Sequence, residues 1–261
     1  MNPIHTEKYF LSAGETNAER ELSLPLLVTR LIDIATAHAN ELGIGNPDMA
    51  HLNGGWVLSR LTIEMTSYPK VDTDYVISTW VESNNRHFST RAFKIEDGEG
   101  KIYGYARSIW MIMNTEDHTN IGLAHIVIPE EMIDGTVVPI GRQARHVPIV
   151  ANEGETALRG ALVATAPPFD YEFQYSDLDF YRHVNTVRYV NLLLNRFTLA
   201  EHDATFVSRL ELSFMHEAKY GMQTQLLRSD LDSGMHSAFQ LSRKADGQAL
   251  FFARVKRENR F

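Results

Sequence analysis

A repeated pattern constrains the fold of this 261-residue chain more than any other feature of its sequence. The tripeptide Ser-Arg-Leu begins at Ser59 and again at Ser208, an offset of 149 residues (208 minus 59), and apolar and polar residues alternate around both copies. Residues 57–65 and 206–214 therefore predict two equivalent strands, each with one buried face. A repeat of this kind indicates two copies of one structural unit.

The two copies stay nearly in step further along the chain. Residues 97–107 and 245–254 each begin near an acidic residue followed by glycine, and each ends in Ala-Arg. An Asp-Gly pair between two alternating stretches is typical of a tight hairpin. We therefore expect two-residue turns at Asp97-Gly98 and at Asp246-Gly247.

Each copy also contains one amphipathic helix before its strands. Apolar residues at helical spacing predict the first helix from about Leu26 to Leu42, and Gly43 is a suitable stop. The second helix is expected directly after His183. One long helix followed by several strands in each half favours an α+β fold, with an antiparallel sheet wrapped round the helix.

The segment between the two copies is rich in proline, glycine and scattered charge, which is typical of a linker. We expect an N-terminal domain over residues 1–130, a linker over 131–155 and a C-terminal domain over 156–261.

Composition excludes several classes of function. The net charge of −8 argues against a protein that wraps nucleic acid, and the lack of cysteine excludes disulfides, a zinc–cysteine cluster and a cysteine nucleophile. No apolar stretch approaches the roughly 20 residues that a membrane span needs. No signal-peptide pattern is visible at the N-terminus, so we expect a soluble cytoplasmic protein.

Polar groups that could perform chemistry cluster in the second copy only. Asp179 and His183 lie just before the second helix, and Glu217 lies where the alternation of the strand 206–214 has ended. The constant offset places these three residues opposite Arg30, Ile34 and Tyr68. We therefore expect chemistry in the second half and a supporting role for the first.

Each of these residues also has a structural interpretation, which the spacing alone leaves open. His183 could be an ordinary exposed histidine, Asp179 could stabilise the positive end of the helix, and Asn185 could be the N-cap. Glu217 could be a charge at the end of a strand. A metal site is not expected, because Asp179 and His183 lack a clear third ligand.

The second copy contains a motif that resembles a known family. Residues 177–189 read D-L-D-F-Y-R-H-V-N-T-V-R-Y, and this run is similar to the signature of the acyl-acyl-carrier-protein (acyl-ACP) thioesterases. The stretches 54–65, G-G-W-V-L-S-R-L-T-I-E-M, and 68–70, Y-P-K, also resemble that family. The resemblance implies two tandem hot-dog domains, no cofactor, and hydrolysis of fatty acyl-ACP in fatty-acid biosynthesis.

The resemblance also assigns roles to particular residues. It implies that Asp179, His183 and Glu217 are catalytic, since the family's glutamate follows its histidine by 34 residues. Tyr181 replaces an asparagine of the family motif, and Asn185 matches a second one, so both are auxiliary candidates. Ala218 stands where some relatives have cysteine, so no thiol is required. We further expect backbone N–H groups at 183–185 to bind an oxyanion.

The substrate would need an apolar pocket and a basic docking surface. The interior of the first domain is the candidate pocket, although its wall residues could equally be ordinary core: Met49, Trp56, Leu58 and Met65. Carrier proteins are acidic, so an acidic enzyme must present local positive charge to one. The candidate docking residues, whose alternative role is a solvated surface, are Arg142, Arg145, Arg182 and Arg188.

Three functions remain open at the level of sequence. The first is an acyl-ACP thioesterase, the second an acyl-CoA thioesterase, and the third a non-catalytic module that binds acyl chains or the carrier protein. A homodimer is compatible with all three.

Overall fold

The computed structural model describes residues 2–49, 53–117, 119–124, 126, 128–152 and 160–260. Two compact units divide the chain, unit 1 at Met1–Gly141 and unit 2 at Arg142–Phe261, and each is described separately. Their boundary lies within the segment 131–155 that the sequence predicts as a linker. Within the described residues, no helix combines the length and the apolar character needed to cross a membrane.

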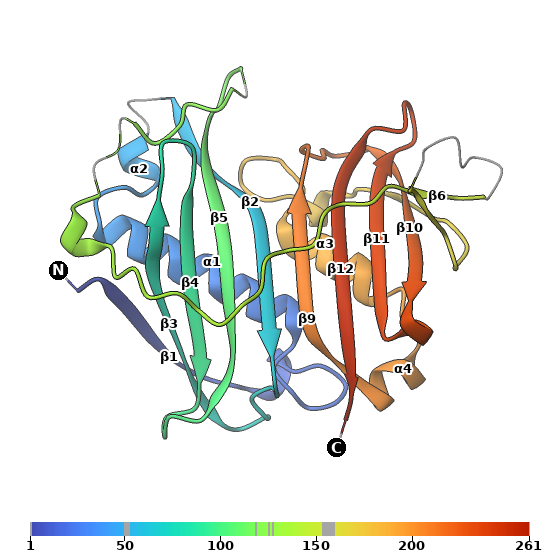
Figure 1. Ribbon diagram of the computed structural model, residues 1–261, viewed down its shortest axis with the longest axis horizontal. Helices are drawn as coiled ribbons and strands as arrows, with labels where there is room; N and C mark the ends of the chain where they lie inside the picture. Colours follow the sequence, from blue (N-terminus) through green and yellow to red (C-terminus); the bar gives the residue numbers. More distant parts are fainter. Residues whose placement is uncertain are drawn as a thin grey trace. The chain divides into compact units, whose positions relative to one another are not determined.

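Unit 1 consists of a long helix against one face of a five-stranded antiparallel sheet (Figure 1). The strand order is β1-β3-β4-β5-β2. The elements are β1 (Ile4–Phe10), α1 (Leu24–Glu41), the short α2 (Asn46–Met49), β2 (Gly54–Met65), β3 (Asp74–Asn84), β4 (Ser89–Glu96) and β5 (Ile102–Asn114).

The helix α1 forms where the apolar spacing predicts it. Its buried side chains recur at helical intervals and face the sheet, among them Leu27, Leu31 and Ile34. Gly43 follows the helix with a φ of 69°, the left-handed conformation in which glycine commonly ends a helix. The predicted stop is therefore confirmed.

Unit 2 repeats this arrangement with a shorter helix. Its main sheet has the order β9-β12-β11-β10-β8, and a second sheet pairs two short strands in parallel. The elements are β6 (Ile149–Val150), β7 (Leu162–Val163), β8 (Phe169–Glu172), α3 (Thr186–Leu194), α4 (Leu199–Ala204), β9 (Thr205–Phe214), β10 (Gln223–Leu231), β11 (His236–Arg243) and β12 (Ala249–Asn259). The strands predicted at 57–65 and 206–214 are confirmed as parts of β2 and β9.

The hairpins predicted from Asp-Gly are present, but their predicted length is wrong. The loop from β4 to β5 spans residues 97–101, and the loop from β11 to β12 spans residues 244–248. In the first loop the glycine with positive φ is Gly100, and the Asp97 side chain accepts backbone N–H groups two and four residues later. The side-chain turn therefore widens the loop beyond the two residues expected.

Residues 133–152 cross the sheet faces that the helices leave open. In unit 1, Val138 and Ile140 pack on Trp80 and Ala92, and Arg107 donates hydrogen bonds to the carbonyls of residues 138 and 140. In unit 2, the amide of residue 144 donates to Glu211 on β9. The segment expected to link the domains thus forms a cover on each unit over part of its length.

Candidate active site

The first part of the site is the loop that precedes α3. One oxygen of Asp179, Oδ1, accepts hydrogen bonds from the backbone N–H groups of Tyr181 at 2.9 Å and His183 at 3.1 Å. Arg182 adopts a φ of 64°, so the chain reverses direction within the loop. The Asp179 carboxylate therefore builds the turn that presents His183.

The second part is the connection between β9 and β10, which fixes the other side of the loop. The N–H of Val184 donates to the carbonyl of Ala218 at 2.9 Å, and His183 forms an antiparallel bridge with Lys219. This short pairing brings His183 beside Glu217, with 3.1 Å between Nε2 and Oε2. Residues far apart in the sequence thus meet in one place.

The pair remains accessible to solvent. The side chains of His183 and Glu217 are 29% and 36% exposed, enough for a water molecule or substrate to reach them. Because an ionised carboxylate only accepts hydrogen bonds, Nε2 of His183 carries the proton in this contact. A histidine held this way by a carboxylate is typical of acid–base sites.

Asn185 is the N-cap of α3, as one interpretation of the sequence holds. Its side-chain oxygen accepts the N–H of Val187 at 3.0 Å. An auxiliary chemical role for Asn185 stays a prediction.

The oxyanion site expected at the backbone of residues 183–185 is not available. The N–H of His183 donates to Asp179, that of Val184 to Ala218, and that of Asn185 to the carbonyl of Asp177. The loop must satisfy these three groups to dock on the β9–β10 connection, so the prediction is wrong for this reason.

Tyr181, which replaces the family's asparagine, packs on its neighbour. Its ring lies 4.0 Å from that of Phe180 between centroids, and 43% of the residue is exposed. Burial, with a smaller contribution from the charge of Asp179, raises the pKa of the phenol above its ordinary value, so it remains a neutral hydrogen-bond donor.

Two residues behind the loop were not singled out from the sequence. Asp177 is buried and accepts hydrogen bonds from the hydroxyl of Tyr171 and the backbone N–H of Gln174. Tyr189 is buried among aromatic rings, and burial, followed by the charges of Glu217 and Asp179, raises its pKa. Both residues lie within the motif at 177–189, so the resemblance of that motif to the family signature was the sequence feature that could have indicated them.

Unit 1 contains the same loop with different side chains. Glu21 donates its backbone N–H to Asn17 Oδ1 at 2.8 Å, Arg20 has a φ of 60°, and the N–H of Leu22 donates to Pro69 at 2.9 Å. Each of these interactions matches one around His183. The counterparts of Asp179 and His183 are therefore Asn17 and Glu21.

The pairing expected from a constant offset is thus wrong for two residues. Arg30 and Ile34 lie within α1 and are not the counterparts of Asp179 and His183. Glu217 does correspond to Tyr68, because Ala218 and Pro69 make equivalent contacts. The offset changes mainly because α1 has 18 residues and α3 has nine.

Comparison with protein families decides where the chain belongs. Its residues 2–130 match the N-terminal domain of acyl-ACP thioesterases, and residues 164–256 match the C-terminal domain. The chain belongs to the acyl-ACP thioesterase family. Both units are thus accounted for by the two domains of this family.

Individual relatives of this acyl-ACP thioesterase family member support the assignment to the family. The chain is 24% identical over 243 residues to a chloroplastic palmitoyl-acyl carrier protein thioesterase from Gossypium hirsutum, covering 90% of this chain and 57% of that protein. It is 23% identical over 231 residues to the chloroplastic oleoyl-acyl carrier protein thioesterase 2 of Arabidopsis thaliana, covering 82% and 60%. The chain spans about half to three-fifths of the length of these curated relatives.

Solved structures show the same fold. The crystal structure of an acyl-ACP thioesterase from Bacteroides thetaiotaomicron VPI-5482 superposes with a TM-score of 0.85 at 25% identity, covering 98% of both chains. The 12:0-ACP thioesterase from Umbellularia californica has a TM-score of 0.80 at 17% identity, covering 99% of this chain and 95% of that one. The prediction of tandem hot-dog domains is confirmed.

The predicted wall residues of the acyl pocket separate along β2. Met49 and Trp56 belong to one apolar cluster at the end of α1, where the indole Nε1 of Trp56 donates to the carbonyl of Ile44 at 2.7 Å. Leu58 lies two residues after Trp56 on the same face of β2. Met65 lies nine residues beyond Trp56, roughly 30 Å along the strand. Met65 therefore does not join the cluster.

The four predicted docking arginines lie on different parts of unit 2. Arg142 and Arg145 are exposed on the segment that crosses the sheet face opposite α3. Arg182 is exposed in the loop before α3. Arg188, on α3, lies 3.9 Å from the Asp177 carboxylate between Nε and Oδ1. The structure thus places these four arginines at separate positions: two lie on the crossing segment, one in the loop before α3 and one on α3 itself.

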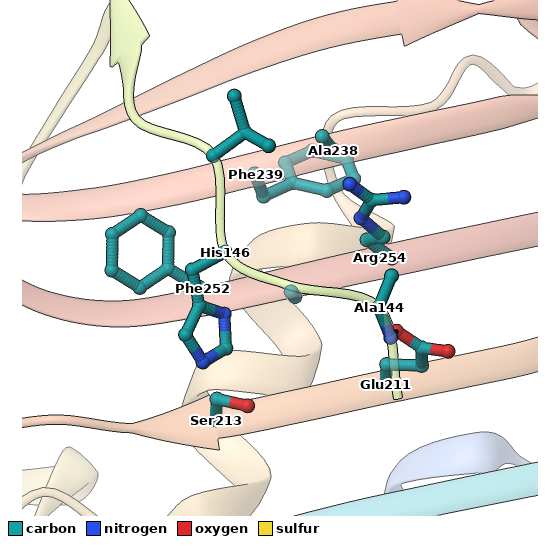
Figure 2. Close-up of a pocket in the computed structure, with 10 residues that line it drawn as sticks. Ala144, His146, Glu211, Ser213, Ala238, Phe239, Phe252 and Arg254 are labelled. Carbon is teal, nitrogen blue, oxygen red and sulfur yellow. Dashed lines mark hydrogen bonds between the residues drawn. The ribbon is translucent and has the colours of Figure 1, made fainter. Parts of the chain in front are cut away.

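The covered face of unit 2 contains hollows away from His183 and Glu217. Figure 2 shows one of these hollows, where His146 and Phe252 lie near Glu211, Ser213 and Arg254. Its volume of about 20 Å³ suits a water molecule rather than an acyl chain. A neighbouring hollow of about 230 Å³ is lined by Arg209, His236 and Lys256 among others. Neither contains a predicted catalytic residue.

Proposed function

We propose that this protein hydrolyses the thioester of fatty acyl-ACP and releases a free fatty acid. The observation that carries the proposal is the contact of 3.1 Å between His183 and Glu217, in a chain whose two units match both domains of the family. The substrate class is that of the family and of its named relatives.

The chemistry requires a base, a positioned water and a leaving thiolate. We assign the base to Glu217, whose carboxylate takes a proton from water as the water oxygen attacks the carbonyl carbon. The C–S bond then breaks and the acid is released. A thiolate with a pKa near 8.5 needs little assistance to leave, and the proton held by Glu217 can return to its sulfur.

His183 and Asp179 have different roles in this mechanism. With Nε2 donating to Glu217, His183 orients the carboxylate and stabilises its charge. Asp179 uses Oδ1 to hold two backbone N–H groups, which makes it a positioning residue rather than the base. Asp179→Asn would retain an acceptor oxygen and should be milder than Asp179→Ala.

The apolar cluster of unit 1 is the proposed site of the acyl chain. It comprises Ile44, Met49, Ile112 and Leu123, with Trp56 packed against it. Replacing Met49 by Trp should shift the preferred chain toward shorter acids. Arg182, which is exposed in the same loop as His183, is the strongest of the four docking candidates.

One assay separates the three functions. Purified protein is mixed with ACP and CoA thioesters of one matched acyl chain, and free thiol is followed. Release from acyl-ACP supports the proposal, and a preference for acyl-CoA supports the second function. No release from either favours the binding module. Glu217→Gln is the matched control, because it removes the base with almost no change of volume.

A homodimer and a cytoplasmic location stay predictions from the sequence. Analytical ultracentrifugation tests the first, and fractionation of cells that express the protein tests the second.

A further inference from the structure

Inside unit 1, one buried arginine has no carboxylate partner among the residues that the structure describes. Arg91 on β4 is only 5% exposed and points to the helix side of the sheet, where its Nη1 donates to Nδ1 of His38 at 2.8 Å. A longer contact of 3.4 Å joins Nη1 to the hydroxyl of Thr79. Among the described residues these are its side-chain partners, so Nε and Nη2 have no acceptor. They form the edge of a guanidinium that usually binds a carboxylate with two hydrogen bonds.

The other buried arginines provide an internal standard. Arg228 and Arg257 in unit 2 are 8% and 6% exposed, and both contact the carboxylate of Glu201, at 3.3 and 2.9 Å. Arg228 also pairs with Asp230 at 2.7 Å. Buried charges are normally paired in this way because desolvation is expensive. Within the described part of the chain, no carboxylate pairs with Arg91.

The cation retains its charge in this place. Burial alone lowers the pKa of Arg91 to about 10, and burial lowers that of His38 to about 4. At neutral pH the pair therefore carries one positive charge, on Arg91, beside a neutral imidazole.

Arg91 shares its face of the sheet with the apolar cluster of unit 1. Arg91 lies opposite Ser108 on β5, and the same phase of β5 continues through Trp110 to Ile112, roughly 13 Å away. Ile112 belongs to the cluster of Met49 and Trp56. Ala39 and Leu42, the residues just after His38 on the same helix end, pack on that cluster too. One positive charge thus lies on the same sheet face as the apolar cluster, about 13 Å along the strand from Ile112.

We propose that Arg91 is the anchor of a carboxylate-binding site inside unit 1, which takes an alkyl chain bearing a carboxylate. Two sources have this chemistry: a free fatty acid, and an acyl chain with a carboxylate at its far end. The carboxylate would occupy the free edge of Arg91 and the alkyl chain the apolar cluster. Only the second source rests on the proposed function.

The first test measures binding without turnover. Dodecanoate labelled with ¹³C at the carboxyl carbon is titrated into the full chain and followed by NMR and calorimetry, with dodecanol as the uncharged control. Arg91→Met should weaken dodecanoate binding by about ten- to hundredfold, the range for a lost hydrogen bond to a charged group. Arg86→Met removes the same charge from an exposed position of unit 1 and should leave binding unchanged.

The second test distinguishes the sources. If dodecanoate does not bind, the wild type should prefer a thioester whose chain ends in a carboxylate over the plain chain, and Arg91→Met should lose this preference. Failure of both arms overturns the site, whereas turnover of the plain thioester would leave the proposed function intact.

Stability provides an independent readout. Since no carboxylate among the described residues neutralises Arg91, Arg91→Met should keep or raise the midpoint of urea unfolding. Whichever of the two ligands binds should raise that midpoint more in the wild type than in Arg91→Met. A lower midpoint in Arg91→Met would show that the guanidinium of Arg91 stabilises the fold, and this result would overturn the proposal.

Discussion

The loops before α1 and α3 have the same backbone conformation and different chemistry. In unit 1, Glu21 pairs with Lys70 at 2.6 Å, while in unit 2, His183 pairs with Glu217 at 3.1 Å. Both loops are fixed by an Asx side chain, a left-handed arginine and a backbone bond to the following strand connection. The loop is therefore a structural element of the fold. What distinguishes unit 2 is the pair of side chains that the loop presents.

The interiors of the two units differ in whether their buried arginines are neutralised. Unit 2 neutralises its buried arginines with Glu201 and Asp230, which is what a stable core requires. In the described part of unit 1, no carboxylate pairs with Arg91. Unit 2 thus combines the accessible pair His183–Glu217 with buried arginines that carboxylates neutralise. Unit 1 combines the ion pair Glu21–Lys70 with a buried arginine that keeps its charge.

The largest expected effect separates the two loops. His183→Ala should lower the rate of thioester hydrolysis by about 10²- to 10⁴-fold, the range for removal of an acid–base group. Glu21→Ala, the same change at the equivalent position of unit 1, should leave that rate within about twofold. Steady-state thiol release measures both, and circular dichroism shows whether each variant folds. Equal losses would mean that the loops are not functionally different.

The next effect concerns the neutralised interior of unit 2. Hydrogen bonds from Thr198 and Arg228 and the charge of Arg257 hold the pKa of Glu201 at about 2, against an ordinary 4.5, despite its partial burial. Glu201→Gln should therefore lower the free energy of unfolding by about 3 kcal/mol at pH 7. Urea unfolding measures this, and Glu258→Gln, at an exposed ion pair, should change it by less than about 0.5 kcal/mol.

The interior of unit 1 should respond to acid through His38. Burial, reinforced by the charge of Arg91, lowers the pKa of His38 from 6.5 to about 4. Between these values the unfolded chain binds a proton that the folded chain does not, so stability falls as pH falls from 6.5 to 4. The loss from this group is about 3 kcal/mol.

His38→Gln removes the titrating group while retaining an acceptor for Arg91. Urea unfolding at pH 7 and pH 4 should show a smaller loss in this variant than in the wild type. Parallel losses in both proteins would show that His38 titrates normally.

The smallest effect compares the two helix caps. Asn185→Ala should cost about 1 kcal/mol, because its side chain accepts the N–H of Val187. Ser23, the N-cap of α1, makes no such side-chain bond, so Ser23→Ala should cost clearly less. Urea unfolding at pH 7 measures both. A greater loss at Ser23 would contradict the assigned caps.

Patterns local to one element were readable from the sequence. The alternation at 57–65 and 206–214 predicted both strands, and the spacing of Leu27, Leu31 and Ile34 predicted α1 to within two residues of each end. These signals arise from burial of one face, which repeats along a strand or helix.

Relations between elements were not readable. A constant offset assumed helices of equal length, but α3 ends at Leu194 and a capping box at Thr198 and Glu201 starts α4. The positive φ of Arg20 and Arg182 gives no sequence signal, since neither is glycine. The engagement of the N–H groups of residues 183–185 depends on contacts with residues 177, 179 and 218. These features depend on how loops dock, which periodicity does not encode.

A double-mutant cycle on the rate of acyl-ACP hydrolysis tests the central claim most directly. The wild type, His183→Ala, Glu217→Gln and the double variant are compared by kcat/KM under the same conditions. If the two side chains act as one unit, the double variant should be about as slow as the slower single variant. Losses that multiply would show that His183 and Glu217 act independently and would contradict the account.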